Sequence, residues 1–167
     1  MNSHAAAPPV PAAHEGHRVA DFVTLTKPRL NFLVLITTLG GLYLAAPTGV
    51  PLPLLLHTLL GTFLVAGGAA ALNQVWEREA DSRMKRTATR PIAARRLGTF
   101  EGTLFGIALS AIGLGELAWQ ANPLAAAVAA LTLASYVLVY TPLKQRTSLS
   151  TLVGGIPGAL PPVIGWA

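Results

Sequence analysis

The sequence LPLLLHTLLGTFLVAGGAAALNQVWEREADSRMKRTATRP, residues 52–91, joins a long apolar run to the most charged part of the chain. Residues 52–75 contain no Lys, Arg, Asp or Glu, and such a run is long enough to cross a bilayer as a helix. The segment from Asn73 to Pro91 then holds three of the chain's seven acids and five of its twelve Lys and Arg residues. The stretch predicts a membrane helix with a charged site at its end.

The composition indicates a membrane protein. The 167 residues are 52% hydrophobic and 11% charged, with a mean hydropathy of +0.53, whereas about 25% of the residues in a soluble domain are charged. The absence of cysteine excludes disulfides, thiolate metal sites and a cysteine nucleophile. A net charge of +5 could indicate a nucleic-acid partner, but the basic residues lie between apolar runs. We therefore interpret them as topology signals and phosphate ligands and expect no nucleic acid.

Five apolar stretches predict an all-α, polytopic transmembrane bundle. They cover about residues 30–46, 52–75, 97–119, 124–140 and 149–167. The short link between the third and fourth predicts an antiparallel helical hairpin, and the many Gly and Pro residues of the fifth predict a kinked or interrupted helix. Residues 1–17 predict a disordered tail, and residues 18–30 an amphipathic helix at the membrane interface.

All twelve Lys and Arg residues fall on one side of this bundle. Three precede the first span, seven lie between the second and third, and two lie between the fourth and fifth. The positive-inside rule makes this side cytoplasmic, so we expect a multi-pass protein of the bacterial inner membrane with its N-terminus and charged segment in the cytoplasm. The chain stops at Ala167 inside an apolar run, and we expect it to be the N-terminal part of a longer protein.

The acidic residues of the charged segment have helical spacing. Asn73, Glu77 and Asp81 lie four residues apart, and each such step on a helix turns the side chain by about 40° and rises about 6 Å. Their oxygens therefore form one stripe, which suits Mg²⁺ because this ion takes few carboxylates and keeps positions for phosphate oxygens. The alternative is a helix cap with exposed ion pairs, followed by a basic loop that only fixes topology.

Basic residues follow the stripe closely, and they can hold a diphosphate by charge and by hydrogen bonds. These candidates are Arg83, Lys85, Arg86 and Arg90. His57 lies inside the second span, about four turns from Asn73, and an ionisable group there is a candidate for the pocket. We favour a hydrogen bond between helices for His57. Glu101, near the inner end of the third span, could either tune the charged segment or be simply solvated, and we expect Glu116, near the outer end, to be solvated.

From about residue 20 to its end the chain resembles the intramembrane prenyltransferases of the UbiA superfamily, and within them the branch that farnesylates protoheme IX. Four stretches carry the resemblance: LTKPRL at 25–30, N-x-x-x-E-x-x-x-D with M-x-R-T-x-x-R-P at 73–91, YTPLKQRT at 140–147 and GGIPGALPPVIGW at 154–166. The quinone and aromatic prenyltransferases usually carry N-D-x-x-D. Here Gln74 and Glu77 stand at those acidic positions, which favours the heme branch.

The resemblance implies roles for individual residues. Asn73, Glu77 and Asp81 match the first acidic motif, which binds Mg²⁺ and the prenyl diphosphate, so they are the catalytic and metal candidates. The candidates for diphosphate binding are Lys85, Arg86, Arg90, Lys144 and Arg146, and Tyr140 is a candidate for the pocket. Family members have about nine spans and a second acidic motif, which this chain lacks. We therefore expect it to hold about half a site and to be inactive alone.

The implied reaction transfers the farnesyl group of farnesyl diphosphate to a vinyl group of heme b and yields heme O. Mg²⁺ and the arginines would stabilise the departing diphosphate. The implied partners are farnesyl diphosphate, heme b and the lipid bilayer, with heme A synthase as a candidate consumer of the product.

Three alternative functions stay open at this point. The chain could belong to a prenyltransferase for aromatic or quinone precursors. It could be part of a membrane transporter whose acidic stripe binds a coupling ion. A structural membrane subunit is the third, although it would leave the spacing of the acids unexplained.

Overall fold

The computed structural model describes residues 15–46 and 48–167, and all regular elements in these ranges are helices. A disordered tail was predicted for residues 1–17, and residues 1–14 of this tail lie outside the described part of the chain. The first helix, α1 (Glu15–Leu25), takes up its last three positions. The prediction of an all-α protein is confirmed.

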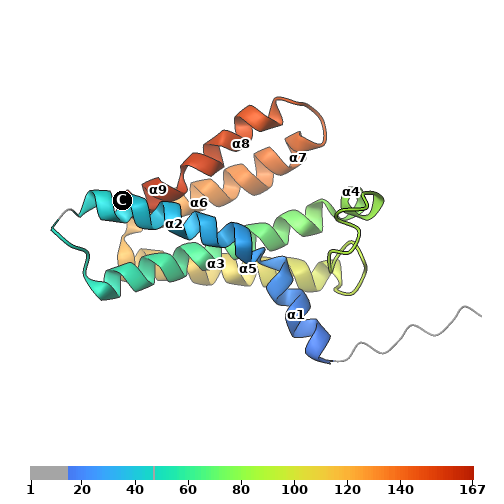
Figure 1. Ribbon diagram of the computed structural model, residues 1–167, viewed down its shortest axis with the longest axis horizontal. Coiled ribbons are helices and arrows are strands. Elements are labelled where there is room, and N and C mark those ends of the chain that lie inside the picture. Colours follow the sequence, from blue (N-terminus) through green and yellow to red (C-terminus); the bar gives the residue numbers. More distant parts are fainter. Residues whose placement is uncertain (1–14, 47) are drawn as a thin grey trace, which may run out of the picture.

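Four helices are long and apolar enough to cross a membrane, and they match the first four predicted spans (Figure 1). They are α2 (Pro28–Ala45), α3 (Leu52–Trp76), α5 (Thr99–Glu116) with the π-helical turn η1 (Leu117–Ala121), and α6 (Pro123–Ala134) with the π-helical segment η2 (Ser135–Tyr140) and α7 (Thr141–Lys144). A short helix, α4 (Arg78–Arg83), follows α3 directly.

The fifth predicted stretch is interrupted, as its Gly and Pro content indicated. It forms α8 (Ser150–Ala159) and α9 (Pro161–Trp166), which are separated at Leu160, where Pro161 and Pro162 cannot supply backbone donors. Neither helix is long enough to be counted as a span. The second helix of this pair, α9, packs closely against α2, where the Gly41 and Gly165 positions leave no room for a Cβ atom.

The site-bearing helix α3 packs most extensively against α5. A Cβ atom on Gly68 would lie 2.6 Å from the Gly106 carbonyl oxygen, and one on Gly113 would lie 2.7 Å from the Gly61 carbonyl oxygen. Glycine at these positions lets the two backbones approach, as small residues do in membrane helix pairs. The small residues of α3 thus permit close packing, and the contact fixes the direction of α3.

The predicted interfacial helix is α1, which lies at an angle to the bundle in Figure 1. Asp21 accepts two hydrogen bonds from Arg96, from Nε at 3.0 Å and from Nη2 at 2.9 Å, and Arg18 pairs with Glu101. Glu101 also accepts a hydrogen bond from the Gly98 backbone N–H at 2.9 Å, so of the readings left open for this residue, simple solvation does not describe it. These contacts attach α1 to the start of α5.

Candidate functional site

The predicted stripe forms where α3 ends and α4 begins. Asn73 lies in the last turns of α3, Glu77 lies between the two helices, and Asp81 lies in α4. The Glu77 N–H donates to the Asn73 carbonyl at 2.9 Å, and the Asp81 N–H donates to the Glu77 carbonyl at 2.8 Å. The helical spacing therefore continues across the break. All three residues are at most 4% exposed, which excludes the solvated cap as their role.

Two cations meet the buried carboxylates. Lys144 Nζ lies 3.0 Å from Glu77 Oε1, and Arg90 Nη1 lies 2.6 Å from Asp81 Oδ2. Arg90 Nη1 is also 3.9 Å from Glu77 Oε2. The loop after α4 returns to the stripe because the buried Thr87 hydroxyl donates to the Asp81 carbonyl at 3.0 Å. Two of the predicted diphosphate ligands, Lys144 and Arg90, are thus brought to the acids from different connections.

A third cation, Lys27, was not predicted as a site residue. It lies between α1 and α2 with φ 49° and ψ 61°, just before Pro28, and its Nζ donates to Asn73 Oδ1 at 3.2 Å. Burial and the nearby positive charge of Arg90 lower the pKa of the Lys27 ammonium to about 8, although Glu77 acts in the opposite direction. Its place in the LTKPRL stretch was the sequence signal that could have identified it.

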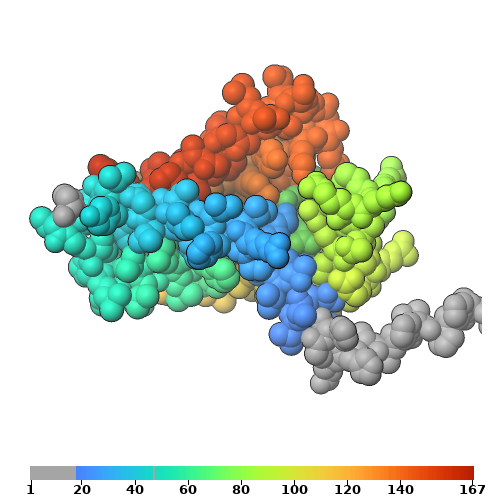
Figure 2. All heavy atoms as spheres, in the orientation of Figure 1, coloured from blue at the N-terminus to red at the C-terminus, as the bar shows by residue number. Residues whose placement is uncertain are grey.

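An apolar cavity of about 660 Å³ opens beside these charges. Lys27, Tyr136 and Tyr140 line its polar end, while residues of α2, α3, α6, α8 and α9 line the rest. The Tyr136 hydroxyl donates to Asn73 Oδ1 at 2.9 Å, and its ring stacks on Tyr140 with 5.4 Å between the ring centroids. Figure 2 shows the segments of α4, in green, and of α7, in orange, at the same end of the molecule. Sequence reasoning missed Tyr136.

Other predicted residues lie away from the acids. Lys85, Arg86 and Arg146 are exposed, as is Arg83, and none of them forms an ion pair within the described part of the chain. They are positioned to attract an anion rather than to contact the stripe.

His57 lies toward the opposite end of α3 from the stripe. Its Nδ1 is 2.6 Å from Glu116 Oε1, so it forms the favoured hydrogen bond between helices α3 and α5. The expectation that Glu116 is only solvated is therefore wrong. Neither residue lines the apolar cavity.

The donor chemistry of the stripe fits Mg²⁺ that arrives with a diphosphate. Glu77 and Asp81 supply hard carboxylate oxygens, and Mg²⁺ is usually held by one or two carboxylates together with substrate phosphates. Among residues 15–46 and 48–167 no three acidic, His or Cys side chains form a metal-binding group, so a closed protein cage does not fit. The site carries one net positive charge, because its three cations, Lys27, Arg90 and Lys144, outnumber the two carboxylates by one. This charge suits an anionic magnesium diphosphate complex.

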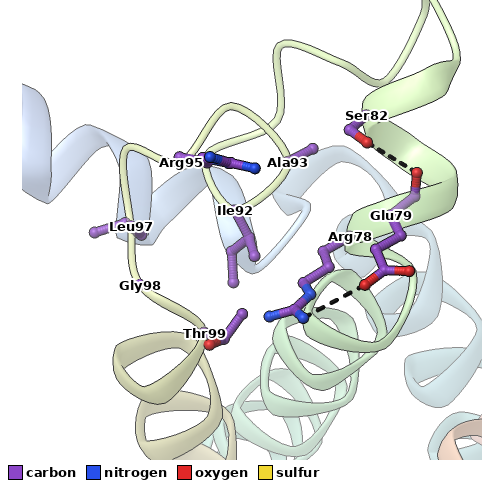
Figure 3. Close-up of a pocket in the computed structure, with 9 residues that line it drawn as sticks. All are labelled: Arg78, Glu79, Ser82, Ile92, Ala93, Arg95, Leu97, Gly98 and Thr99. Carbon is purple, nitrogen blue, oxygen red and sulfur yellow. Dashed lines mark hydrogen bonds and ion pairs between the residues drawn. The ribbon is translucent and has the colours of Figure 1, made fainter.

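A second cavity, of about 370 Å³, is lined by other residues of α4 and the following loop (Figure 3). Arg78, Glu79 and Ser82 line it from α4, and Arg95 and Thr99 line it from the loop and the start of α5. Arg78 pairs with the exposed Glu79 at 3.5 Å. The exposed ion pair expected of a simple cap exists here, and this cavity contains none of the predicted site residues.

Comparison with known proteins identifies the relatives of this chain. The model of the UbiA prenyltransferase family matches residues 34–167. The chain is 48% identical over 156 residues to a protoheme IX farnesyltransferase of Solibacter usitatus, covering 88% of this chain and 53% of the relative. It is 50% identical over 147 residues to one of Myxococcus xanthus, covering 88% and 50%. No solved structure matches. The chain spans about half the length of these curated relatives.

Proposed function

The chain belongs to the UbiA prenyltransferase family, and on that premise we propose that the full-length protein transfers the farnesyl group of farnesyl diphosphate to a vinyl group of heme b. Relatives that share about half of the residues are named protoheme IX farnesyltransferases. The observation that carries the proposal is the buried acidic stripe with its three cations, one of which, Lys27, lines an apolar cavity of about 660 Å³. A diphosphate and an isoprenoid chain require this combination of charge and apolar volume.

The proposed diphosphate site works by exchange of partners. Lys144 and Arg90 now neutralise Glu77 and Asp81, because a buried carboxylate without a partner would be strongly destabilising. Glu77 and Asp81 would hold Mg²⁺, which would supply positive charge to the leaving diphosphate. Lys144 and Arg90 would then be free to bind phosphate oxygens through charge-assisted hydrogen bonds. Each buried carboxylate therefore has a positively charged partner with and without the ligand.

The apolar cavity would hold the farnesyl chain and exclude water. The bond between the farnesyl C1 and the diphosphate oxygen breaks with both electrons passing to the diphosphate, which leaves an allylic cation. The vinyl π electrons of heme b form the new carbon–carbon bond. Water then adds to the neighbouring carbon and loses a proton, which gives the hydroxyethylfarnesyl group of heme O. The faces of Tyr136 and Tyr140 at the polar end of the cavity favour a nearby cation.

We further propose that the protein lies in the bacterial inner membrane with the stripe on the cytoplasmic side. The cations that contact the stripe precede α2, follow α4 and end α7. The positive-inside rule assigns such a side to the cytoplasm. Heme A synthase, which acts on heme O, is the candidate partner that would receive the product.

The test uses the full-length protein in detergent with heme b, farnesyl diphosphate and Mg²⁺, and it detects heme O by mass-resolved chromatography. Asp81→Asn is expected to lose nearly all product, because Asp81 is a buried carboxylate of the stripe. Glu79→Gln is the matched control, since Glu79 is an exposed acid on the same helix. Prenylation of an aromatic acceptor in place of heme would contradict the proposal and assign the protein to the quinone branch.

A further inference from the structure

The amide of Asn73 is oriented by two donors that converge on its oxygen. Lys27 Nζ lies 3.2 Å and the Tyr136 hydroxyl 2.9 Å from Asn73 Oδ1. A carbonyl oxygen of this kind has two lone pairs, so both are engaged. A metal ion could bind Oδ1 only by displacing one of these donors.

The identity of the oxygen does not depend on an arbitrary assignment of the amide. An Asn side chain can be turned over without changing its shape, but Lys27 has only donors and no acceptor. Turning the amide would place its NH₂ group against the ammonium. Lys27 therefore fixes Oδ1 toward itself and points Nδ2 in the other direction.

The Asn73 Nδ2 atom is buried and has no hydrogen-bond partner within the part of the chain that the structure describes. Native proteins rarely leave such a donor unsatisfied, and an exception calls for an unseen ligand or another explanation. Among the described residues, two other buried atoms, Thr62 Oγ1 and Gln74 Oε1, also have no hydrogen-bond partner. Only Asn73 Nδ2 belongs to a residue of the charged stripe, one helical turn from Glu77.

We infer that Asn73 binds the diphosphate as a hydrogen-bond donor through Nδ2 and leaves the metal to Glu77 and Asp81. This inference rests on the proposed diphosphate site but does not depend on which acceptor is prenylated. It replaces the metal-ligand role that the four-residue spacing predicted for Asn73. An amide with its oxygen held by Lys27 and Tyr136 is a preorganised donor, because its orientation does not change when the anion binds.

The two roles predict opposite effects of an isosteric change. Asn73→Asp keeps an oxygen for Lys27 and Tyr136 but replaces the NH₂ donor by a negatively charged acceptor. A metal ligand would tolerate this change, since carboxylate is a good ligand for Mg²⁺. A diphosphate donor would not, because the new charge repels the anion. Asn73→Ala removes both functions, and Glu77→Gln serves as the reference for loss of a metal ligand.

The experiment measures two affinities of the full-length protein in detergent. Electron paramagnetic resonance reports the binding of Mn²⁺ alone, and calorimetry reports the binding of inorganic diphosphate at saturating Mn²⁺. For Asn73→Asp we expect diphosphate affinity to fall about 10- to 100-fold, as for loss of a hydrogen bond to a charged group. For Asn73→Ala we expect Mn²⁺ affinity to stay within about twofold of the wild type, while Glu77→Gln lowers it about tenfold or more.

Two results would overturn the inference: wild-type diphosphate affinity in Asn73→Asp, or a loss of Mn²⁺ affinity in Asn73→Ala as large as that in Glu77→Gln. Circular dichroism and gel filtration confirm that each variant is folded. A wild-type protein that binds diphosphate with Mn²⁺ but does not prenylate heme b would refute the proposed reaction and leave the role of Asn73 standing. Absence of diphosphate binding in the wild type would refute both.

Discussion

Replacement of Gly68 by Ala tests whether close packing between α3 and α5 positions the site. The new Cβ atom would lie 2.6 Å from the Gly106 carbonyl oxygen and 2.9 Å from the Ser110 backbone nitrogen, and it would also meet the Ser110 hydroxyl. Ser110 donates to the Gly106 carbonyl at 2.8 Å, so moving its side chain would break that hydrogen bond. The backbones must separate by at least 0.4 Å to bring the first contact to 3.0 Å, below which real Cβ atoms are essentially never found.

Overpacking of this kind costs about 1 to 3 kcal/mol, but replacing Gly by Ala inside a helix also gains about 1 kcal/mol of helix propensity. Gly40→Ala provides the matched control, because Gly40 lies in α2 and nothing lies within 4 Å of its added Cβ atom. The propensity gain is common to both variants. The free energy of unfolding of Gly68→Ala should therefore be lower than that of Gly40→Ala by the overpacking cost, about 1 to 3 kcal/mol.

The assay compares thermal unfolding of the two full-length variants in the same detergent. About 1 kcal/mol shifts the Tm of a chain of 150 to 250 residues by about 2 to 4 °C and that of a longer chain by less, so we expect a difference of about 1 to 6 °C in Tm between the full-length variants. Gly68→Ala should also lose activity, because Asn73 lies five residues further along the same helix. Equal Tm values and equal activities for the two variants would refute the idea that this contact fixes α3.

Three further predictions concern the site itself. In a steady-state assay, Lys144→Met should raise the KM for farnesyl diphosphate about tenfold or more, because Lys144 Nζ contacts Glu77. The control Arg86→Met removes an exposed side chain and should change this KM less than about threefold. Tyr136→Phe keeps the ring that stacks on Tyr140 but removes the hydroxyl that donates to Asn73, so kcat/KM should fall about 3- to 10-fold. The control Tyr43→Phe changes an exposed side chain, and its kcat/KM should match that of the wild type. Chelation of divalent ions with EDTA should stop heme O formation and added Mg²⁺ should restore it; product formed after exhaustive chelation would contradict a metal held by Glu77 and Asp81.

The parts of the structure that depend on local sequence were predictable. Apolar runs of sufficient length fixed α2, α3, α5 and α6 to within a few residues, since a spanning helix satisfies its own backbone groups. The stripe was predictable for the same reason, because residues four apart stay on one side of a helix whatever surrounds them. The break at Leu160 followed from two adjacent prolines.

The contacts that complete the site join residues far apart in the chain and were not predictable from spacing. Lys27 and Tyr136 lie 46 and 63 positions from Asn73, the residue to which both donate. Lys27 looked like one of many basic residues at a membrane edge, and Tyr136 looked like one more aromatic residue in an apolar span. Only the packing of α2 and η2 against α3 gives them a shared acceptor.

The same basic residues can serve membrane topology and chemistry. Three separate connections each send one cation to the stripe: Lys27 precedes α2, Arg90 follows α4 and Lys144 ends α7. All three connections lie at the same end of the bundle in Figure 1. A bound diphosphate that contacts these cations would therefore link segments that are distant in sequence and would stabilise the folded state in proportion to its affinity. A rule that places positive charge on one side of the membrane thus also gathers the cations that an anionic substrate needs.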